Sequence, residues 1–201
     1  MDNKGFWNIV APLYSRFMRN NETVYKQSCS LIATHINPNM KVLELACGTG
    51  EFTEILADFV GEYIATDFSE AMVCKGRGKS QKRNVEFMVE DATNLTFEAN
   101  SFDAVLIANS LHVMPNPQNA LREIHRVLNK GGLLFAPTFI FDSNRTKLRV
   151  RLLELIGFRV YNKWREDDLL ELISKSGFKT ISHNKIVASP LSELVIISQK
   201  A

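Results

Sequence analysis

Short apolar runs alternate with amphipathic segments between Lys41 and Pro137. The apolar runs, which predict β-strands, lie at residues 42–45, 62–67, 85–89, 102–108 and 133–136. The segments that predict helices lie at residues 52–60, 69–75 and 115–128. Continuous apolar runs are typical of parallel strands that are covered on both faces. The alternation of strands and helices therefore predicts a parallel sheet with right-handed crossovers.

The two flanks follow a different pattern. Residues 6–36 predict a largely helical segment whose apolar side chains form either a docking face on the domain or a lid over a ligand. Residues 146–161 and 165–176 predict helices, and residues 180–185 and 194–198 predict strands joined by a turn at Ser189-Pro190. Because no helix separates these last two strands, we expect them to pair antiparallel.

These elements together predict an α/β fold. We expect a Rossmann-like, doubly wound sheet of about seven strands, parallel at its centre, with an antiparallel C-terminal hairpin at one edge and helices on both faces. A chain of 201 residues predicts a single domain, residues 1–201. Within it we expect an N-terminal lid or docking segment (1–37), a ligand-binding core (41–137), and substrate-side helices with the C-terminal strands (138–201).

Composition narrows the functional classes only slightly. A net charge of +2 argues neither for nor against a polyanionic partner, and the basic run at 75–83 lacks interleaved aromatic residues. Cys29, Cys47 and Cys74 are odd in number and far apart, which argues against a disulfide framework and a zinc site. Neither a signal peptide nor an apolar run of membrane-spanning length is visible. We therefore expect a cytoplasmic protein without stable membrane insertion and without a bound metal.

The first strand runs straight into a glycine turn. Gly48 and Gly50 allow a sharp bend and leave room for a ligand beside the backbone, while the start of the next helix offers unpaired N–H groups. Glu44 lies inside the apolar strand, where an unsatisfied carboxylate costs about 2–7 kcal/mol. Two interpretations of Glu44 stay open: it contacts the ligand, or it braces the turn by accepting its amides.

Other residues separate the classes of nucleotide site. Thr53 stands where the dinucleotide fingerprint needs its third glycine, and no Gly-Lys-Ser/Thr follows the turn as a Walker loop requires. Asp67 ends the second strand, where its carboxylate can accept hydrogen bonds from both hydroxyls of a ribose. Asp67 with Glu70 is also a possible helix cap.

The order of these motifs resembles the class I S-adenosylmethionine (SAM) dependent methyltransferases. Glu44, Gly48 and Gly50 match the glycine signature of that family, with Ala46 in place of the first glycine, and Asp67 matches its acidic residue. Asp91-Ala92 and the runs 95–103 and 126–132 match later blocks in order. Residues 91–97 and 100–103 resemble the small-molecule branch that includes the ubiquinone and menaquinone methylating enzymes.

The resemblance implies SAM as cofactor, S-adenosylhomocysteine (SAH) as product, and methyl transfer by in-line displacement. It places Asn109 near the transferred methyl group, and His112 is the candidate general base. The full set of expected cofactor-binding residues is Tyr14, Glu44, Ala46, Gly48, Thr49, Gly50, Asp67, Phe68, Met72, Asp91, Ala92 and Asn109.

The substrate is less well specified. Nucleic-acid amino methylases of this family carry N/D-P-P-Y after the fourth strand, whereas this chain has Asn109-Ser110-Leu111-His112. The arginine–asparagine pair of the quinone methylases is also absent. We therefore expect an unidentified small-molecule acceptor and no nucleic acid. A SAM-binding sensor or scaffold, and a nicotinamide-dependent oxidoreductase, are the alternatives; the sequence does not indicate an oligomeric state.

Overall fold

The computed structural model describes residues 22–141, 159–188 and 192–201. The helices are α2 (Glu22–Ala33), α3 (Thr53–Leu56), α4 (Glu70–Lys79), α5 (Pro117–Val127) and α7 (Glu166–Lys175), with short 3₁₀ helices η2 (Ala57–Phe59) and η3 (Leu111–Val113). The strands are β1 (Lys41–Leu45), β2 (Glu62–Asp67), β3 (Val85–Val89), β4 (Phe102–Ile107), β5 (Leu128–Ile140), β6 (Phe178–Ile186) and β7 (Ser192–Lys200). Tyr14, the predicted helix at 146–161 and the turn at Ser189-Pro190 lie wholly or largely outside the described residues.

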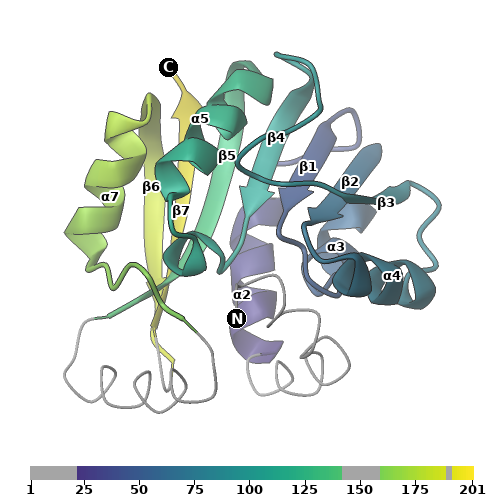
Figure 1. The fold of residues 1–201 in the computed structure, drawn as a ribbon, viewed down its shortest axis with the longest axis horizontal. Helices are drawn as coiled ribbons and strands as arrows, with labels where there is room; N and C mark the ends of the chain where they lie inside the picture. The colour runs from purple at the N-terminus through teal and green to yellow at the C-terminus, as the bar shows by residue number, and fades with distance from the viewer. Residues whose placement is uncertain (1–21, 142–158, 189–191) are drawn as a thin grey trace.

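The seven strands form one sheet in the order β3-β2-β1-β4-β5-β7-β6 (Figure 1). Strands β3, β2, β1, β4 and β5 are parallel neighbours, whereas β7 pairs antiparallel with both β5 and β6. The predicted parallel centre and antiparallel C-terminal hairpin are therefore confirmed. The hairpin enters the sheet with its second strand, so that β7 lies inside and β6 forms the edge.

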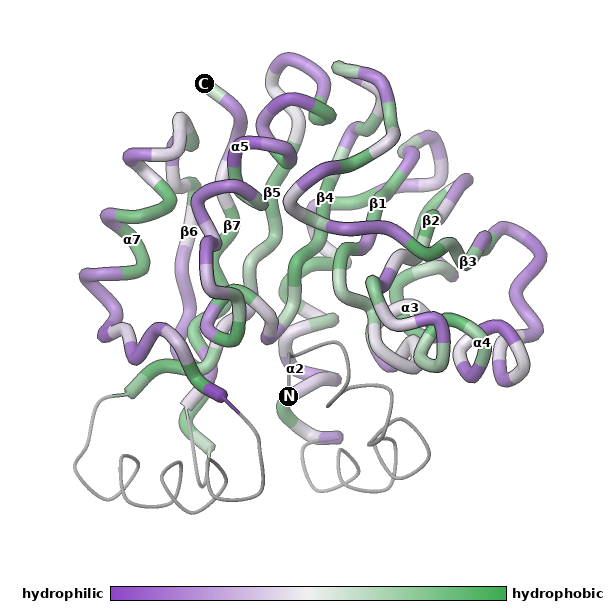
Figure 2. Tube along the Cα trace, viewed as in Figure 1, coloured by the Kyte–Doolittle hydropathy of each residue, from purple (hydrophilic) through white to green (hydrophobic). Residues whose placement is uncertain are grey.

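Helices cover both faces of the sheet, as the continuous apolar runs predicted. On one face, α5 and α7 pack Leu121, Ile124, Leu169 and Ile173 into a core with alternate residues of β1, β4, β5 and β7. On the other, residues of α2, α3 and α4 pack against the intervening positions of β1, β2, β4 and β5. Figure 2 shows the resulting pattern: hydrophobic residues run through the central strands, while the residues of β6 at the edge are largely hydrophilic.

Strand β5 is longer than its sequence pattern predicted. Asn129 to Gly132 were expected to end the preceding helix and to precede a strand at 133–136, but the strand already begins at Leu128. Its pairing with β4 shifts register between the Phe102 and Ala104 positions. Gly131, with φ +73°, supplies the left-handed backbone that such a bulge favours. The bulge lets the chain leave α5 and enter the ladder without a loop.

The order of the strands fixes where a ligand can bind. From β1 the chain moves to β2 and β3 on one side, and then crosses to β4 on the other. Neighbouring loops diverge above β1 and β4 at such a reversal and leave a crevice at the carboxyl ends of the strands. Among the described residues, no helix is long and apolar enough to cross a membrane.

Candidate functional site

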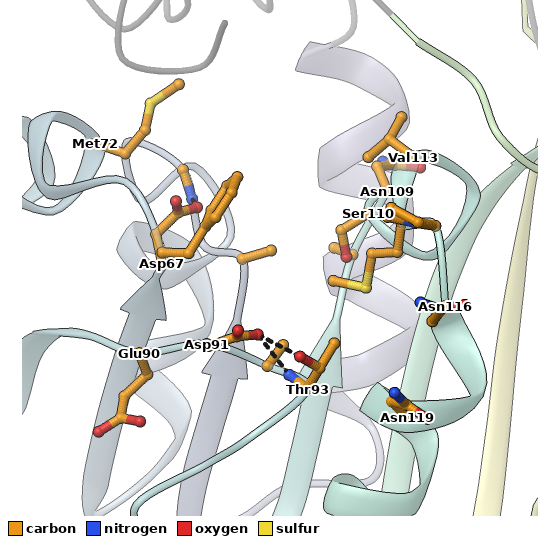
Figure 3. A pocket seen from close by; sticks show the side chains of 17 residues that line it. Asp67, Met72, Glu90, Asp91, Thr93, Asn109, Ser110, Val113, Asn116 and Asn119 are labelled. Carbon is orange, nitrogen blue, oxygen red and sulfur yellow. Dashed lines mark hydrogen bonds between the residues drawn. The ribbon is translucent and has the colours of Figure 1, made fainter. Parts of the chain in front are cut away.

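A cavity of about 440 Å³ lies at the carboxyl ends of β1, β2, β3 and β4 (Figure 3). Among the residues predicted to bind the cofactor, those that line it are Ala46, Gly48, Asp67, Phe68, Met72, Asp91, Ala92 and Asn109. Figure 3 shows Asp67, Met72, Glu90 and Asp91 on one side and Asn109, Ser110 and Val113 on the other. The volume is within the range of small-molecule and cofactor sites, roughly 300–1,000 Å³.

Backbone hydrogen bonds, one of them to β2, hold the turn after β1. The Cys47 N–H donates to Thr66 O at 2.9 Å, and the Gly50 N–H closes the turn onto Cys47 O at 3.0 Å. Ala46 and Gly48 have left-handed φ values of +54° and +57° and both line the cavity. Ala46 stands where the glycine signature that this turn resembles has its first glycine, and a glycine adopts this left-handed φ without the strain that a side chain causes.

Thr49 and Gly50, although predicted to bind the cofactor, do not line the cavity. The Thr49 hydroxyl donates to Glu51 Oε1 at 2.6 Å. Gly50 has φ +82°, and a Cβ on it would lie 3.2 Å from the Phe87 ring of β3. The second glycine of the turn therefore serves the left-handed bend and the close packing of turn against strand.

Asp67 connects the end of β2 to the turn. Its Oδ2 accepts the Gly48 N–H at 3.0 Å, and its Oδ1 accepts the Ser69 N–H at 2.9 Å. The residue is 6% exposed, and burial raises its pKa to about 6, against the lowering effect of the two amides. Each carboxylate oxygen has two lone pairs, so each can accept one further hydrogen bond from a ligand in the cavity.

Glu44 occupies a different position from the one we expected. Its carboxyl is 1% exposed, lies outside the cavity lining, and accepts the Thr53 hydroxyl at 2.5 Å and the Tyr63 hydroxyl at 2.8 Å. Burial raises its pKa to about 8 despite these two hydrogen bonds. The predicted contact with the ligand is therefore not what this geometry offers, and the partners that satisfy Glu44 are hydroxyls rather than the amides of the turn.

The far end of the cavity combines an acidic and an apolar surface. Asp91 follows β3, and its Oδ1 accepts both the backbone N–H and the hydroxyl of Thr93, at 2.8 and 2.7 Å. This leaves Asp91 Oδ2 for a ligand. Phe68, just before α4, and Met72, in its first turn, supply apolar side chains on the same side. Such a surface suits a flat aromatic base with an exocyclic amino group.

Asn109 follows β4 and is fixed from three directions. Its φ is +49°, its backbone N–H donates to Pro137 O of β5 at 2.8 Å, and its side-chain Nδ2 donates to Glu193 Oε2 of β7 at 2.7 Å. Its Oδ1 is buried without a hydrogen-bond partner, as is the hydroxyl of Ser110. Buried polar atoms are nearly always paired, so two orphans on one cavity wall indicate a place for a ligand.

His112 is not in the cavity lining. The side chain is 3% exposed and packs its ring against Phe139 and Phe141, with centroids 5.8 and 6.3 Å away. Burial lowers its pKa to about 4, and its Nδ1 has no partner. A neutral imidazole with so low a pKa is a weak base, and its side chain does not line the cavity. The geometry does not support His112 as the general base.

Sequence reasoning missed part of the lining. The further residues that line the cavity are Glu90, Thr93, Ala108, Ser110, Val113, Met114, Pro115, Asn116 and Asn119. Four of these residues are direct neighbours of predicted ones: Glu90, Thr93, Ala108 and Ser110. Extending each predicted motif by one residue on either side would have included them. Met114, Pro115 and Asn116 form the connection from η3 to α5, and Asn119 lies in the first turn of α5. Only the tertiary structure brings these residues to the cavity.

Comparison with known proteins gives a consistent result. A family model described as a methyltransferase domain matches residues 43–136. The chain is 31% identical over 174 residues to the demethylmenaquinone methyltransferase of Paenarthrobacter aurescens (strain TC1), covering 77% of this chain and 68% of that protein. It is also 31% identical over 171 residues to that of Staphylococcus haemolyticus (strain JCSC1435), covering 73% and 72%.

A solved structure extends the likeness to the fold. The magnesium protoporphyrin IX methyltransferase of Synechocystis PCC 6803, determined with bound SAH, superimposes with a TM-score of 0.73 at 17% identity. The superposition covers 90% of this chain and 84% of that one.

Proposed function

The chain belongs to the class I SAM-dependent methyltransferase family, and we propose that it transfers the methyl group of SAM to a small-molecule acceptor. The single observation that carries the site assignment is the Asp67 carboxylate. It is buried at the end of β2, anchored to the turn through Gly48, and left with lone pairs that face a cavity of suitable size.

The described residues fit SAM in three parts. Asp67 accepts the two ribose hydroxyls. Asp91 Oδ2 and the Ala92 amide meet the polar edge of adenine, while Phe68 and Met72 pack on the ring. The amino-acid end lies between the carboxyl ends of the neighbouring strands β1 and β4, beside Ala46 and Asn109.

Methyl transfer from SAM depends little on a general acid or base. The cofactor supplies an electrophilic methyl group on a sulfonium, and the positive charge on sulfur is lost in the displacement. The protein orients the reactants, and holding two reactants at attack distance can supply about 7–11 kcal/mol of the barrier. Asn109 and Ser110 provide the ordered wall at the end of β4. The buried position of His112 agrees with a reaction that depends on alignment.

Two facts support a small-molecule acceptor. The two relatives described above are named for demethylmenaquinone. The nucleic-acid methylase motif is absent after β4, where the chain has Asn109-Ser110-Leu111-His112. A quinone itself is not proposed, because the arginine–asparagine pair of the quinone methylases is absent. The free cysteines Cys29, Cys47 and Cys74 suit a cytoplasmic setting for this reaction.

A binding experiment followed by a labelling experiment tests the proposal. SAM and SAH should each raise the melting temperature of the protein, whereas NAD should not. Incubation with methyl-labelled SAM and a protein-free metabolite extract should then give a labelled small molecule. Stabilisation by NAD alone would overturn the cofactor assignment. SAM binding without any labelled product in extracts from several sources would favour the sensor alternative over the enzyme.

A further inference from the structure

Glu193 is a buried carboxyl group that the sequence analysis did not single out. It lies on β7, is 0% exposed, and comes 84 residues after Asn109 in the chain. Its Oε2 accepts the Asn109 side-chain Nδ2 at 2.7 Å, and its Oε1 accepts the hydroxyl of Ser28 on α2. A carboxyl group in this environment costs several kcal/mol of desolvation unless it is hydrogen-bonded. Its place beside the buried apolar run 194–197 therefore needs a reason.

The chemistry of the pair fixes the orientation of the Asn109 carboxamide. Burial raises the pKa of Glu193, and the hydrogen bonds donated by Ser28 and Asn109 oppose that rise, so both donors favour the ionised form. An ionised carboxylate only accepts hydrogen bonds, which turns the NH₂ group of Asn109 towards Glu193 and its Oδ1 away. The Oδ1 is buried and has no hydrogen-bond partner. Glu193 thus decides which end of this amide is satisfied inside the protein and which end is left as a free acceptor.

The free acceptor lies near the amino-acid end of the proposed cofactor site. In the β1–β4 pairing Leu45 is opposite Ile107, so the turn that begins at Ala46 runs beside Ala108 and Asn109. The ammonium group is the strongest hydrogen-bond donor at that end of SAM. Glu44, one of the acidic candidates for a ligand contact, is instead hydrogen-bonded to Thr53 and Tyr63. On this wall, the Asn109 Oδ1 is a side-chain acceptor without a hydrogen-bond partner.

We propose that Glu193 is a positioning residue, which holds the Asn109 carboxamide so that Asn109 Oδ1 accepts a hydrogen bond from the ammonium group of the bound cofactor. This inference rests on the proposed function, since it assumes that the cavity binds SAM and SAH. Ser28 belongs to the same arrangement, because its hydroxyl satisfies the second oxygen of Glu193 and so ties the carboxyl to α2.

The test measures how much the amino group of the ligand contributes to binding. Dissociation constants are determined by calorimetry for SAH and for its deaminated analogue, in which hydrogen replaces the amino group. The ratio of the two constants in each variant isolates the ammonium contact, as in a double-mutant cycle. In the wild type we expect the analogue to bind roughly tenfold or more weakly, because hydrogen bonds to charged groups are among the strong ones.

Two substitutions of matched length separate positioning from packing. Glu193→Met keeps the length of the side chain but offers no acceptor, and we expect the ratio to fall to about threefold or less. Glu193→Gln offers Asn109 an acceptor oxygen of the same geometry, and we expect the ratio to stay within about threefold of the wild-type value. Asn109→Ala removes the Oδ1 itself, so its ratio should fall even if Glu193→Met does not fold.

The outcomes separate this inference from the proposed function. If the wild-type protein binds neither SAM nor SAH, both the proposed function and this inference are wrong. A wild-type protein that binds SAH, with an unchanged ratio in Glu193→Met or in Asn109→Ala, would overturn the inference alone. Equal weakening of SAH and its analogue in Glu193→Met would show that Glu193 is only structural, and would also overturn it.

Discussion

The carboxylate of Asp67 accepts the backbone N–H of Gly48 at 3.0 Å. This hydrogen bond joins the last residue of β2 to the turn after β1, so that the proposed ribose acceptor and the turn are held as one unit. The second oxygen of Asp67 accepts the Ser69 N–H at 2.9 Å, which directs the chain into α4. Replacing Asp67 therefore removes two internal hydrogen bonds together with the proposed ligand contact.

Asp67→Ala should weaken SAH binding by about 100-fold or more, and Asp67→Asn by roughly tenfold. The amide can still accept hydrogen bonds, but it carries no charge and its NH₂ must face one of the two backbone donors. Calorimetric titration with SAH measures both effects. Glu70→Gln, three residues further on, exposed and outside the cavity lining, is the matched control and should bind as the wild type does. If Asp67→Ala binds SAH with unchanged affinity, the assignment of Asp67 to the ribose is wrong.

Binding of SAH should weaken as the pH falls from 7.5 to 5. Burial raises the pKa of Asp67 to about 6, so the carboxyl is ionised at pH 7.5 and mostly protonated at pH 5. A protonated carboxyl loses acceptor strength, and we expect a loss of affinity of up to about tenfold. Titrations at several pH values test this, and in Asp67→Asn the dependence should largely disappear. A wild-type affinity that does not change with pH would contradict the assignment of Asp67.

Ala46→Gly should stabilise the protein by about 1 kcal/mol, because Ala46 adopts a φ of +54° that a glycine adopts without strain. Urea unfolding gives the free energy. Ala57→Gly is the matched control, since Ala57 has an ordinary helical φ of −61° and the same change there should destabilise the protein by a similar amount. Destabilisation by Ala46→Gly would show that the Ala46 side chain contributes packing that outweighs its strain.

The Glu44 carboxyl should make the wild type less stable as the pH rises from 5 to 8. Its pKa is raised from 4.5 to about 8 by burial, so the folded state binds a proton that the unfolded state releases above pH 4.5. The stabilisation is complete below that pH and is lost as the pH rises towards 8. The side chain of Glu44→Gln cannot titrate. Between pH 5 and pH 8 its free energy of unfolding, measured in urea, should therefore fall by about 2 to 4 kcal/mol less than that of the wild type. Identical pH profiles for the two proteins would refute the raised pKa.

His112 should make the protein less stable as the pH falls, in contrast to Glu44. Burial lowers its pKa from 6.5 to about 4, so the unfolded state binds more protons between these values. Stability is therefore lost as the pH falls from 6.5 towards 4. His112→Leu should remove about 1 to 3 kcal/mol of that loss, measured by unfolding at pH 7 and pH 4.5. His183→Gln, at an exposed position on β6, serves as the control and should follow the wild type.

The local pattern of the sequence determined the elements and the main wall of the site. Hydrophobic periodicity and turn residues act over a few positions, so strands β1 to β4, the turn at Gly48 and the acidic residue at the end of β2 were all predictable. Because parallel strands end at the same edge of a sheet, Asp67, Asp91 and Asn109 were also expected to converge there. The structure places all three in the cavity lining.

The tertiary structure alone decided which side chains pair. The sequence pattern shows that Glu44 lies in a buried strand, but which partners it has depends on the neighbouring strand and helix, which supply Tyr63 and Thr53. The loop position of His112 suggested chemistry, yet Phe139 of β5 and the adjoining Phe141 enclose it. Glu193 reaches Asn109 only because β7 inserts between β5 and β6. Such contacts depend on the order and register of strands distant in sequence, which local periodicity does not encode.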